Sequence, residues 1–255
     1  SFALVIMLST QAWSADKLNQ VVAEITGKGQ SAEAAVCDIA KPADFAQMIE
    51  QITEKHGRLD VLEKDGWWEQ PPSLADNPVW PRHPASFGSG GAQMYAYDVN
   101  GDNLNDIISC LSAHGYGLAW FEQYREGTDI KFRQHTFMNQ KSEENRYGVH
   151  FSQPHALDLV DMDRDGLKDI VVGKRFWAHG PTGDPEPNAP AVLYWFELRR
   201  EAGKGARFVP HLIDNDSGVG TQVATANLNA DALPDVIVGN KKGIFVFLSR
   251  IAQAR

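Results

Sequence analysis

The stretch Asp161-Met162-Asp163-Arg164-Asp165-Gly166-Leu167-Lys168-Asp169, followed at once by Ile170-Val171-Val172-Gly173, decides how this chain folds. Carboxylates occupy positions 1, 3, 5 and 9 of the loop, glycine occupies position 6, and an apolar strand follows. Alternating acidic side chains direct their oxygens at one centre, and the glycine allows the sharp turn that keeps them there. Such carboxylates repel one another unless a hard cation such as Ca²⁺, which takes about six to eight oxygen ligands, lies between them. The stretch therefore predicts a calcium-binding loop that leads into a buried strand.

Two further copies of this loop occur, at residues 98–106 and 227–235, so the three loops start 63 and 66 residues apart. Each copy leads into an apolar strand, as the first does. An isolated loop of this composition would be interpreted as a solvated Asp/Asn-rich turn. Three in register favour a metal-binding repeat for the first two loops and leave both interpretations open for the third.

The repeated unit reads as a strand, the acidic loop, an apolar strand, an aromatic strand and an outer strand that ends in histidine. The expected strands are 93–97, 107–111, 117–122 and 131–135, then 155–160, 170–173, 192–197 and 207–211, then 222–226, 236–239 and 243–248. Four strands per repeat are typical of a propeller blade. We therefore expect a mainly β fold, a partial or open β-propeller of about three four-stranded blades, preceded by a small αβαβ segment. Closed propellers have about four to eight blades, so a fragment, an open stack and part of an assembly all remain possible.

The loops and the strands after them resemble the FG-GAP or VCBS repeat family, best known from the integrin α-subunit propeller. In that family the side chains at loop positions 1, 3, 5 and 9 and the carbonyl oxygen at position 7 bind Ca²⁺. Carried over by position, the resemblance implies these ligands: Asp161, Asp163, Asp165, Leu167 and Asp169; Asp98, Asn100, Asp102, Leu104 and Asp106; and Asn227, Asn229, Asp231, Leu233 and Asp235.

The first and third loops depart from the pattern at position 6, where Asn103 and Ala232 replace glycine. Asparagine tolerates positive φ well, whereas alanine costs about 1 kcal/mol or more if that position is left-handed. Because ligand charge helps to set affinity, calcium should bind most tightly to the second loop, then to the first, then to the third. An EF-hand fits poorly, because Val172 stands where its twelfth-position glutamate would be.

The composition excludes some other classes of protein. Hydrophobic residues make up 43% of the 255 residues, enough for a sizeable core, and the formal net charge of −9 argues against a nucleic-acid partner. No stretch approaches the roughly 20 apolar residues of a membrane span. Cys37 and Cys110 lie in segments of different character, which argues against a disulfide framework.

Residues 1–15 resemble the apolar core and cleavage site of a secretory signal, with an apolar run at 2–8 and small residues before a break after Ser14. A buried strand explains the same apolar run equally well. With the calcium loops, the signal interpretation predicts a secreted, periplasmic or cell-surface protein.

Residues 16–62 read as helix, strand, helix and strand, the order of a parallel α/β sheet, with the elements at 16–28, 34–39, 42–55 and 59–62. Lys17-Leu18-Asn19-Gln20-Val21-Val22-Ala23-Glu24-Ile25, Val36-Cys37-Asp38-Ile39 and Gly57-Arg58-Leu59-Asp60-Val61-Leu62 resemble the middle of a short-chain dehydrogenase. The resemblance implies that Asp38 would lie against the adenine of a nicotinamide cofactor. The family's glycine-rich phosphate loop and its Tyr-x-x-x-Lys pair are both missing, so the alternative is a structural or foreign segment.

From residue 63 to 255 the chain is expected to be β, beginning with a loop at 66–72 and an edge strand at 79–83. His114, His150, His155 and His179 stand near predicted loops, where packing and hydrogen bonding are the simpler explanation. Trp67, Trp68 and Trp177 could stack on a sugar or belong to the core, and the 180–190 loop is a candidate recognition surface.

These features favour a calcium-binding repeat module, an extracytoplasmic binding or scaffold protein with a protein or polysaccharide ligand, over an enzyme. One alternative is a propeller-based polysaccharide lyase or hydrolase that uses the histidines. The other is an NAD(P)-dependent oxidoreductase fragment without catalytic residues, suggested only by residues 16–62.

Overall fold

A computed structural model of the chain describes the backbone of residues 2–9 and 31–38, and then residues 47, 48, 50, 60–76, 78–90, 93–201 and 205–250. It divides into two compact units, residues 1–62 with 67–83 and residues 63–66 with 84–255. The described residues are mainly β, with one short 3-10 helix, Ser142–Glu144. None of their helices is long and apolar enough to cross a bilayer.

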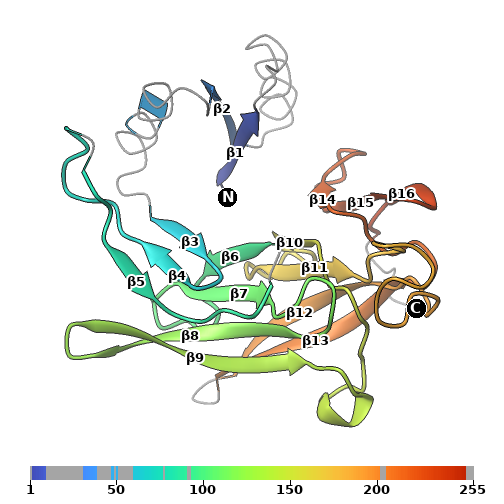
Figure 1. Ribbon diagram of the computed structural model, residues 1–255. Helices are drawn as coiled ribbons and strands as arrows, with labels where there is room; N and C mark the ends of the chain where they lie inside the picture. Colours follow the sequence, from blue (N-terminus) through green and yellow to red (C-terminus); the bar gives the residue numbers. More distant parts are fainter. Residues whose placement is uncertain are drawn as a thin grey trace. The chain divides into compact units, whose positions relative to one another are not determined.

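The first repeat is a four-stranded antiparallel sheet whose strands follow one another in chain order (Figure 1). Its strands are β6 (Met94–Tyr97), β7 (Asp106–Cys110), β8 (Leu118–Glu126) and β9 (Asp129–Met138). Every residue of β7 is buried, because β7 lies between two neighbouring strands and is covered on both faces. The outer strand β9 alternates between exposed and half-buried residues, as expected of an edge strand.

The second repeat forms the same sheet with the same strand order. Its strands are β10 (Leu157–Val160), β11 (Asp169–Gly173), β12 (Leu193–Glu201) and β13 (Gly205–Asp214). The pairing of the last two strands shifts register next to Leu193, as the equivalent pairing in the first repeat does next to Leu118. The two sheets therefore share an irregularity as well as their topology.

The third repeat contributes three strands to the described residues: β14 (Val223–Ala226), β15 (Asp235–Asn240) and β16 (Gly243–Phe247). All eleven strands expected in the repeats from residue 93 onward are present, and the third and fourth strands of the first two sheets run three or four residues past their predicted ends. The sequence pattern is thus confirmed as a series of antiparallel sheets.

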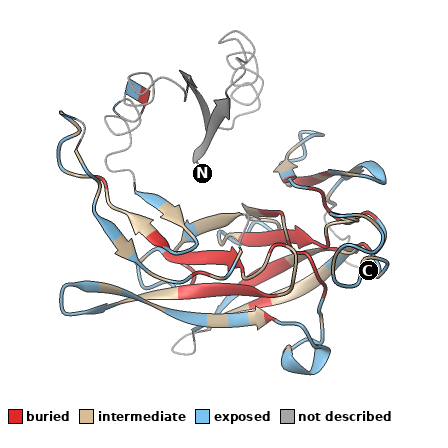
Figure 2. Cartoon of the chain, in the orientation of Figure 1, coloured by how far each residue is buried: buried red, intermediate tan, exposed pale blue. Residues whose placement is uncertain are grey.

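The second sheet has a hydrophobic core on each face, and β11 contributes side chains to both. Ile170 and Val172 pack in the larger core, with Ile108, Leu157 and Phe196, whereas Val171 packs in the other. The second core also holds Leu193, Val219, Val236 and Val238. This arrangement explains why β11 is an unbroken apolar run, since successive side chains of a strand point to opposite faces. Figure 2 shows the buried residues concentrated in β7, β8, β11 and β12.

A further three-stranded sheet precedes the repeats, with β3 (Val61–Glu63), β4 (Gly66–Trp68) and β5 (Arg82–Pro84). The prediction of a loop at 66–72 is wrong at its start, where β4 lies. The expected edge strand at 79–83 is present only as the shorter β5. The placement of 59–62 in a parallel sheet is also wrong, because β3 pairs within this sheet.

Two strands form a parallel pair near the N-terminus, β1 (Phe2–Ser9) and β2 (Ser31–Asp38). The strand interpretation of the first apolar run is therefore the one observed, and the strand expected at 34–39 is present. The helices expected at 16–28 and 42–55 lie outside the described residues except for Gln47, Met48 and Glu50, which are helical. The αβαβ segment as a whole is not supported by the residues described.

Candidate metal centres and the histidine cluster

All three acidic loops turn through left-handed residues at positions 4 and 6. These residues are Gly101 and Asn103, Arg164 and Gly166, and Ala230 and Ala232, with φ between 61° and 92°. Position 6 was expected to be left-handed, and Ala232 therefore carries the predicted strain. Position 4 was not expected, because arginine and alanine are not residue types that favour positive φ.

The aspartate at position 9 braces each loop against the sheet. Its Oδ2 accepts a hydrogen bond from the N–H at loop position 2, and its Oδ1 accepts one from a residue in or just after the third strand of the sheet. The three aspartates, Asp106, Asp169 and Asp235, are fully buried. Their donors are Val99 and Gln123, Met162 and Leu198, and Leu228 and Ser249, at 2.7–2.9 Å. Two hydrogen bonds from backbone N–H groups make this residue the anchor of the repeat.

Part of this anchor occurs once more, before the three repeats, at the exposed Asp60. Asp60 Oδ1 accepts a hydrogen bond of 3.0 Å from the N–H of Gln70, just after β4. The matching donor to Asp106 in the first repeat is Gln123, in β8. The sequence from Asp60 therefore follows the repeat pattern of aspartate, strand and aromatic strand. Leu59-Asp60-Val61-Leu62 suits the dehydrogenase pattern as well as the repeat pattern.

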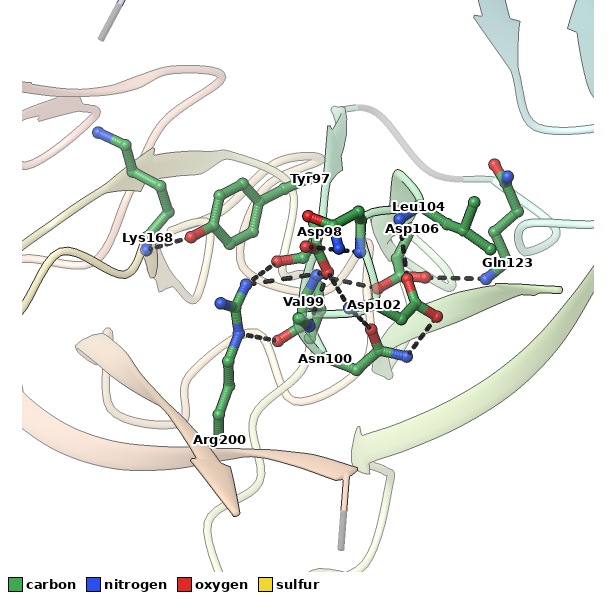
Figure 3. A network of polar contacts seen from close by, with 12 residues as sticks. Tyr97, Asp98, Val99, Asn100, Asp102, Leu104, Asp106, Gln123, Lys168 and Arg200 are labelled. Carbon is green, nitrogen blue, oxygen red and sulfur yellow. Dashed lines mark hydrogen bonds and ion pairs between the residues drawn. The ribbon is translucent and has the colours of Figure 1, made fainter. Parts of the chain in front are cut away.

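The first loop is held by its own hydrogen bonds and by the following sheet (Figure 3). Asp98 accepts hydrogen bonds from the N–H groups of Gly101, Asp102 and Asn103 at 2.7–3.2 Å. Arg200 of β12 donates to the Val99 carbonyl oxygen at 2.9 Å and also to the Asp98 carbonyl oxygen. The loop is thus a preformed turn clamped by the following sheet.

The second loop brings its carboxylates closest together. Ligand oxygens of Asp161, Asp163 and Asp169 lie within 4.8 Å of one another. Burial raises the pKa of Asp169 to about 7, with Asp163 and Asp165 adding to the shift, against the hydrogen bonds from Leu198 and Met162. Burial also raises the pKa of Asp163. A bound cation would favour the ionised form of both groups.

The third loop has the same backbone conformation as the other two but only two carboxylates, Asp231 and Asp235. Asp231 accepts a hydrogen bond from the N–H of Leu233 at 2.9 Å, matching Asp165 and Leu167 in the second loop. Asn227 Oδ1, at position 1, is buried without a hydrogen-bond partner, whereas Asp161 accepts from Asp165 and Gly166. A buried acceptor without a partner is costly.

The second loop fits a calcium ion, because oxygens about 2.3–2.6 Å from one ion lie within about 5 Å of one another. Positions 1, 3 and 9 supply these oxygens, as the resemblance implies. Asp165 Oδ1, at position 5, accepts from the Leu167 N–H and is outside this group. In the first loop Asn100 and Asp102 are joined to each other, and Asp106 serves the two backbone donors described above.

A tryptophan, a glutamate and a histidine form a second repeated brace on the outer strands. The rings of Trp120 and His135 stack at 4.3 Å, and His135 Nε2 lies 2.7 Å from Glu122 Oε2. The same contacts join Trp195, His211 and Glu197, and again Trp67, His83 and Glu69. Trp67 therefore packs on His83 within its own sheet. Trp177 stacks on Phe176 and donates a hydrogen bond to Asn188 Oδ1.

Three of the four noted histidines meet near Asp184. His179 Nδ1 lies 2.8 Å and His114 Nδ1 3.5 Å from Asp184 Oδ1, and the His155 ring stands 5.4 Å from that of His114. His150 is exposed and not among them. Burial lowers the pKa of His155, with Arg175 and His114 adding to the shift. Asp184, in the 180–190 loop, was not identified from the sequence, because its role depends on how that loop folds back.

Comparison with known proteins adds one finding, for the N-terminal part. Residues 5–65 match the short chain dehydrogenase family. The match begins inside β1, ends before β4 and covers a minority of the chain, so it characterises this segment alone. The parallel pairing of β1 with β2 agrees with it, since parallel strands joined by a crossover build such sheets. No curated protein matches the chain.

Proposed function

We propose that residues 63–255 form a calcium-binding repeat module of the FG-GAP or VCBS type, an extracytoplasmic binding or scaffold protein built as a partial or open β-propeller. The observation that carries the proposal is the second loop, where three carboxylates converge on one centre while the backbone of the loop is fixed by its own hydrogen bonds. Bringing these charges together is unfavourable without a cation and favourable with one. The ligand of the module would be a protein or a polysaccharide.

The test is the calcium dependence of thermal stability. After EDTA treatment, added Ca²⁺ should raise the melting temperature, because a ligand at a hundred times its Kd stabilises a folded protein by about 2.7 kcal/mol. Asp163→Ala should remove more of that shift than Asn229→Ala, which changes the same loop position in the third repeat. A melting temperature that calcium leaves unchanged would reject the proposal.

A second candidate is a polysaccharide lyase or hydrolase, which the convergence of His114, His155 and His179 favours. His155 has a lowered pKa and is thus a neutral imidazole suited to accept a proton at neutral pH. Incubation with a panel of polysaccharides should then yield products with the wild-type chain and none with His155→Ala. Equal activity in both proteins would remove this candidate.

A third candidate, an oxidoreductase fragment, rests on the family match at residues 5–65. A cofactor would lie near Asp38, at the end of β2, if the segment binds dinucleotides as that family does. NADH fluorescence should change on mixing with the chain in that case. An unchanged spectrum would leave the segment a structural role.

A further inference from the structure

The histidine cluster is built by loops at the ends of the sheets opposite the acidic loops. The acidic loops connect the first and second strands of each sheet, as β6 to β7 and β10 to β11. His114 lies in the β7–β8 connection, and His179 and Asp184 lie in the β11–β12 connection. In an antiparallel sheet, consecutive connections fall at opposite ends. The cluster is therefore separate from the calcium loops.

Three potential metal ligands converge there. One ligand atom each from His114, His179 and Asp184 lies within 4.8 Å of the others. The two imidazole rings are 4.7 Å apart and tilted by 31°. Asp184 Oδ1 stands between them, 2.8 Å from His179 Nδ1 and 3.5 Å from His114 Nδ1. Both histidines thus present the same ring nitrogen to one carboxylate oxygen.

The carboxylate is positioned by its surroundings. The Asp184 side chain is only 5% exposed, and its Oδ2 accepts a hydrogen bond from the His179 N–H at 2.9 Å. With its amide oriented to accept from Lys174 Nζ, Gln153 also donates to Oδ2, at 3.3 Å. Gln153 and Lys174 are fully buried. Oδ2 is therefore held by the protein, and Oδ1 is left to face the two imidazoles, as outer partners do for metal ligands.

The fold of the 180–190 loop accounts for the hydrogen bonds between His179 and Asp184. It does not account for the position of His114 Nδ1. His114 Nδ1 is buried and has no hydrogen-bond partner, because 3.5 Å from Asp184 Oδ1 is too long for a good hydrogen bond. Buried polar atoms without partners are rare in folded proteins. A cation bound between the three residues would satisfy this nitrogen, and loop closure alone does not.

We propose that His114, His179 and Asp184 bind a divalent transition-metal ion of the zinc class, with at least one coordination position open to solvent or a ligand. Two imidazole nitrogens and one carboxylate oxygen suit zinc, whereas Ca²⁺ takes oxygen ligands. To lie about 2.0–2.2 Å from one ion the ligand atoms would rearrange slightly, with the 2.8 Å pair of His179 Nδ1 and Asp184 Oδ1 opening to admit the ion. His179 is exposed, so the ion would be reached from solvent.

The test is a Zn²⁺ titration of the full chain by isothermal calorimetry, in excess Ca²⁺ so that the acidic loops are saturated. The expected result is one bound Zn²⁺ per chain. His179→Ala, at an exposed position, and Asp184→Asn should each weaken binding by at least about tenfold, since even outer-shell changes cost about 10- to 100-fold. His150→Ala, also exposed, removes a histidine outside the cluster and should leave the affinity unchanged.

Cobalt provides an independent readout, since Co²⁺ at a site with imidazole ligands gives visible absorption bands that Zn²⁺ would abolish by displacement. The bands should be lost in His114→Ala and His179→Ala, with circular dichroism showing that each variant is folded. If His114→Ala does not fold, His179→Ala and Asp184→Asn decide the matter. Stoichiometry below one, or equal losses in His179→Ala and His150→Ala, would overturn the proposal.

Discussion

The second and third repeats have the same backbone and different charges. Both loops have left-handed residues at positions 4 and 6, and both are anchored by a buried aspartate, Asp169 or Asp235. The second loop adds carboxylates at positions 1 and 3, where the third has Asn227 and Asn229. The turn is therefore specified by the position-9 aspartate and short side-chain bonds to the backbone. The carboxylates at positions 1 and 3, which the third loop lacks, are what the proposed metal site adds to this shared turn.

The largest expected effect comes from the anchor, which the two repeats share. Asp169→Ala and Asp235→Ala should each lower the free energy of unfolding in EDTA by about 2–5 kcal/mol, because each leaves two backbone N–H groups without an acceptor. Chemical denaturation measures the change, with Asp129→Ala, at an exposed position of the first sheet, as the control. A loss confined to Asp169→Ala would mean that the anchors are not equivalent.

A carboxylate introduced at position 1 of the third loop should give that loop some of the cation affinity expected of the second. Asn227→Asp should strengthen calcium binding by the third loop by about tenfold, equivalent to about 1.4 kcal/mol, because it adds an ionised ligand where Asn227 Oδ1 now lacks a partner. Calcium titration of the variant and the wild type measures the gain. Asn215→Asp, which adds the same charge at an exposed position outside the loop, should give none.

The two loops have different residues at position 6, Gly166 and Ala232, and each can be replaced by the other's residue type. Ala232→Gly should stabilise the protein by about 0.5–1 kcal/mol, because relief of left-handed strain exceeds the entropy cost of glycine in the unfolded chain. Gly166→Ala should destabilise it by about as much, since the added Cβ would meet no atom within 4 Å and only the backbone is strained. Equal stabilities in thermal denaturation would contradict both.

The smallest effect concerns the outer brace of the second sheet. Glu197 precedes Leu198, whose N–H donates to Asp169. At the equivalent place in the third repeat, Leu248 precedes Ser249, whose N–H donates to Asp235. Hydrogen bonding to Arg199, then to His211, lowers the pKa of Glu197 below 4.5. A lowered pKa gives stability that is present above pH 4.5 and lost as pH falls through the folded-state value.

Glu197→Gln should therefore lower stability at pH 7 by less than about 1 kcal/mol, and this difference from the wild type should shrink below pH 4.5. Denaturation curves at pH 7 and pH 3.5 measure it. His150→Ala, away from the brace, should show no such pH-dependent difference. A difference that stays constant with pH would assign the effect to packing.

The repeats were predictable because each strand and loop is encoded within a few residues. Ile170, Val171 and Val172 mark a buried strand, and the spacing of the acidic residues marks the turn. The braces were not predictable, because Trp195 meets His211 only through the register of β12 with β13. The hydrogen bond that Asp60, inside the dehydrogenase match, accepts from Gln70 was not predictable either, because the two residues lie ten positions apart.

Of the candidate ligands, those at positions 1, 3 and 9 of the second loop lie close together, and that they bind a cation stays a prediction. Asp184 escaped prediction because a lone aspartate among prolines and glycines has no periodicity. The left-handed Arg164 escaped it too. Its conformation is imposed by the bonds that Asp161 accepts from Asp165 and Gly166, against the preference of the residue itself.

The contacts between successive sheets have a consequence for how the molecule comes apart. Arg200 of β12 holds the first acidic loop, the Lys168 N–H donates to the Tyr97 hydroxyl, and Thr225 donates to Asp158. Each sheet is thus hydrogen-bonded to the one before it, and the stability of each repeat depends on its neighbour. Neighbouring repeats should open together, and amide exchange in β7 and β11 should report a single cooperative transition.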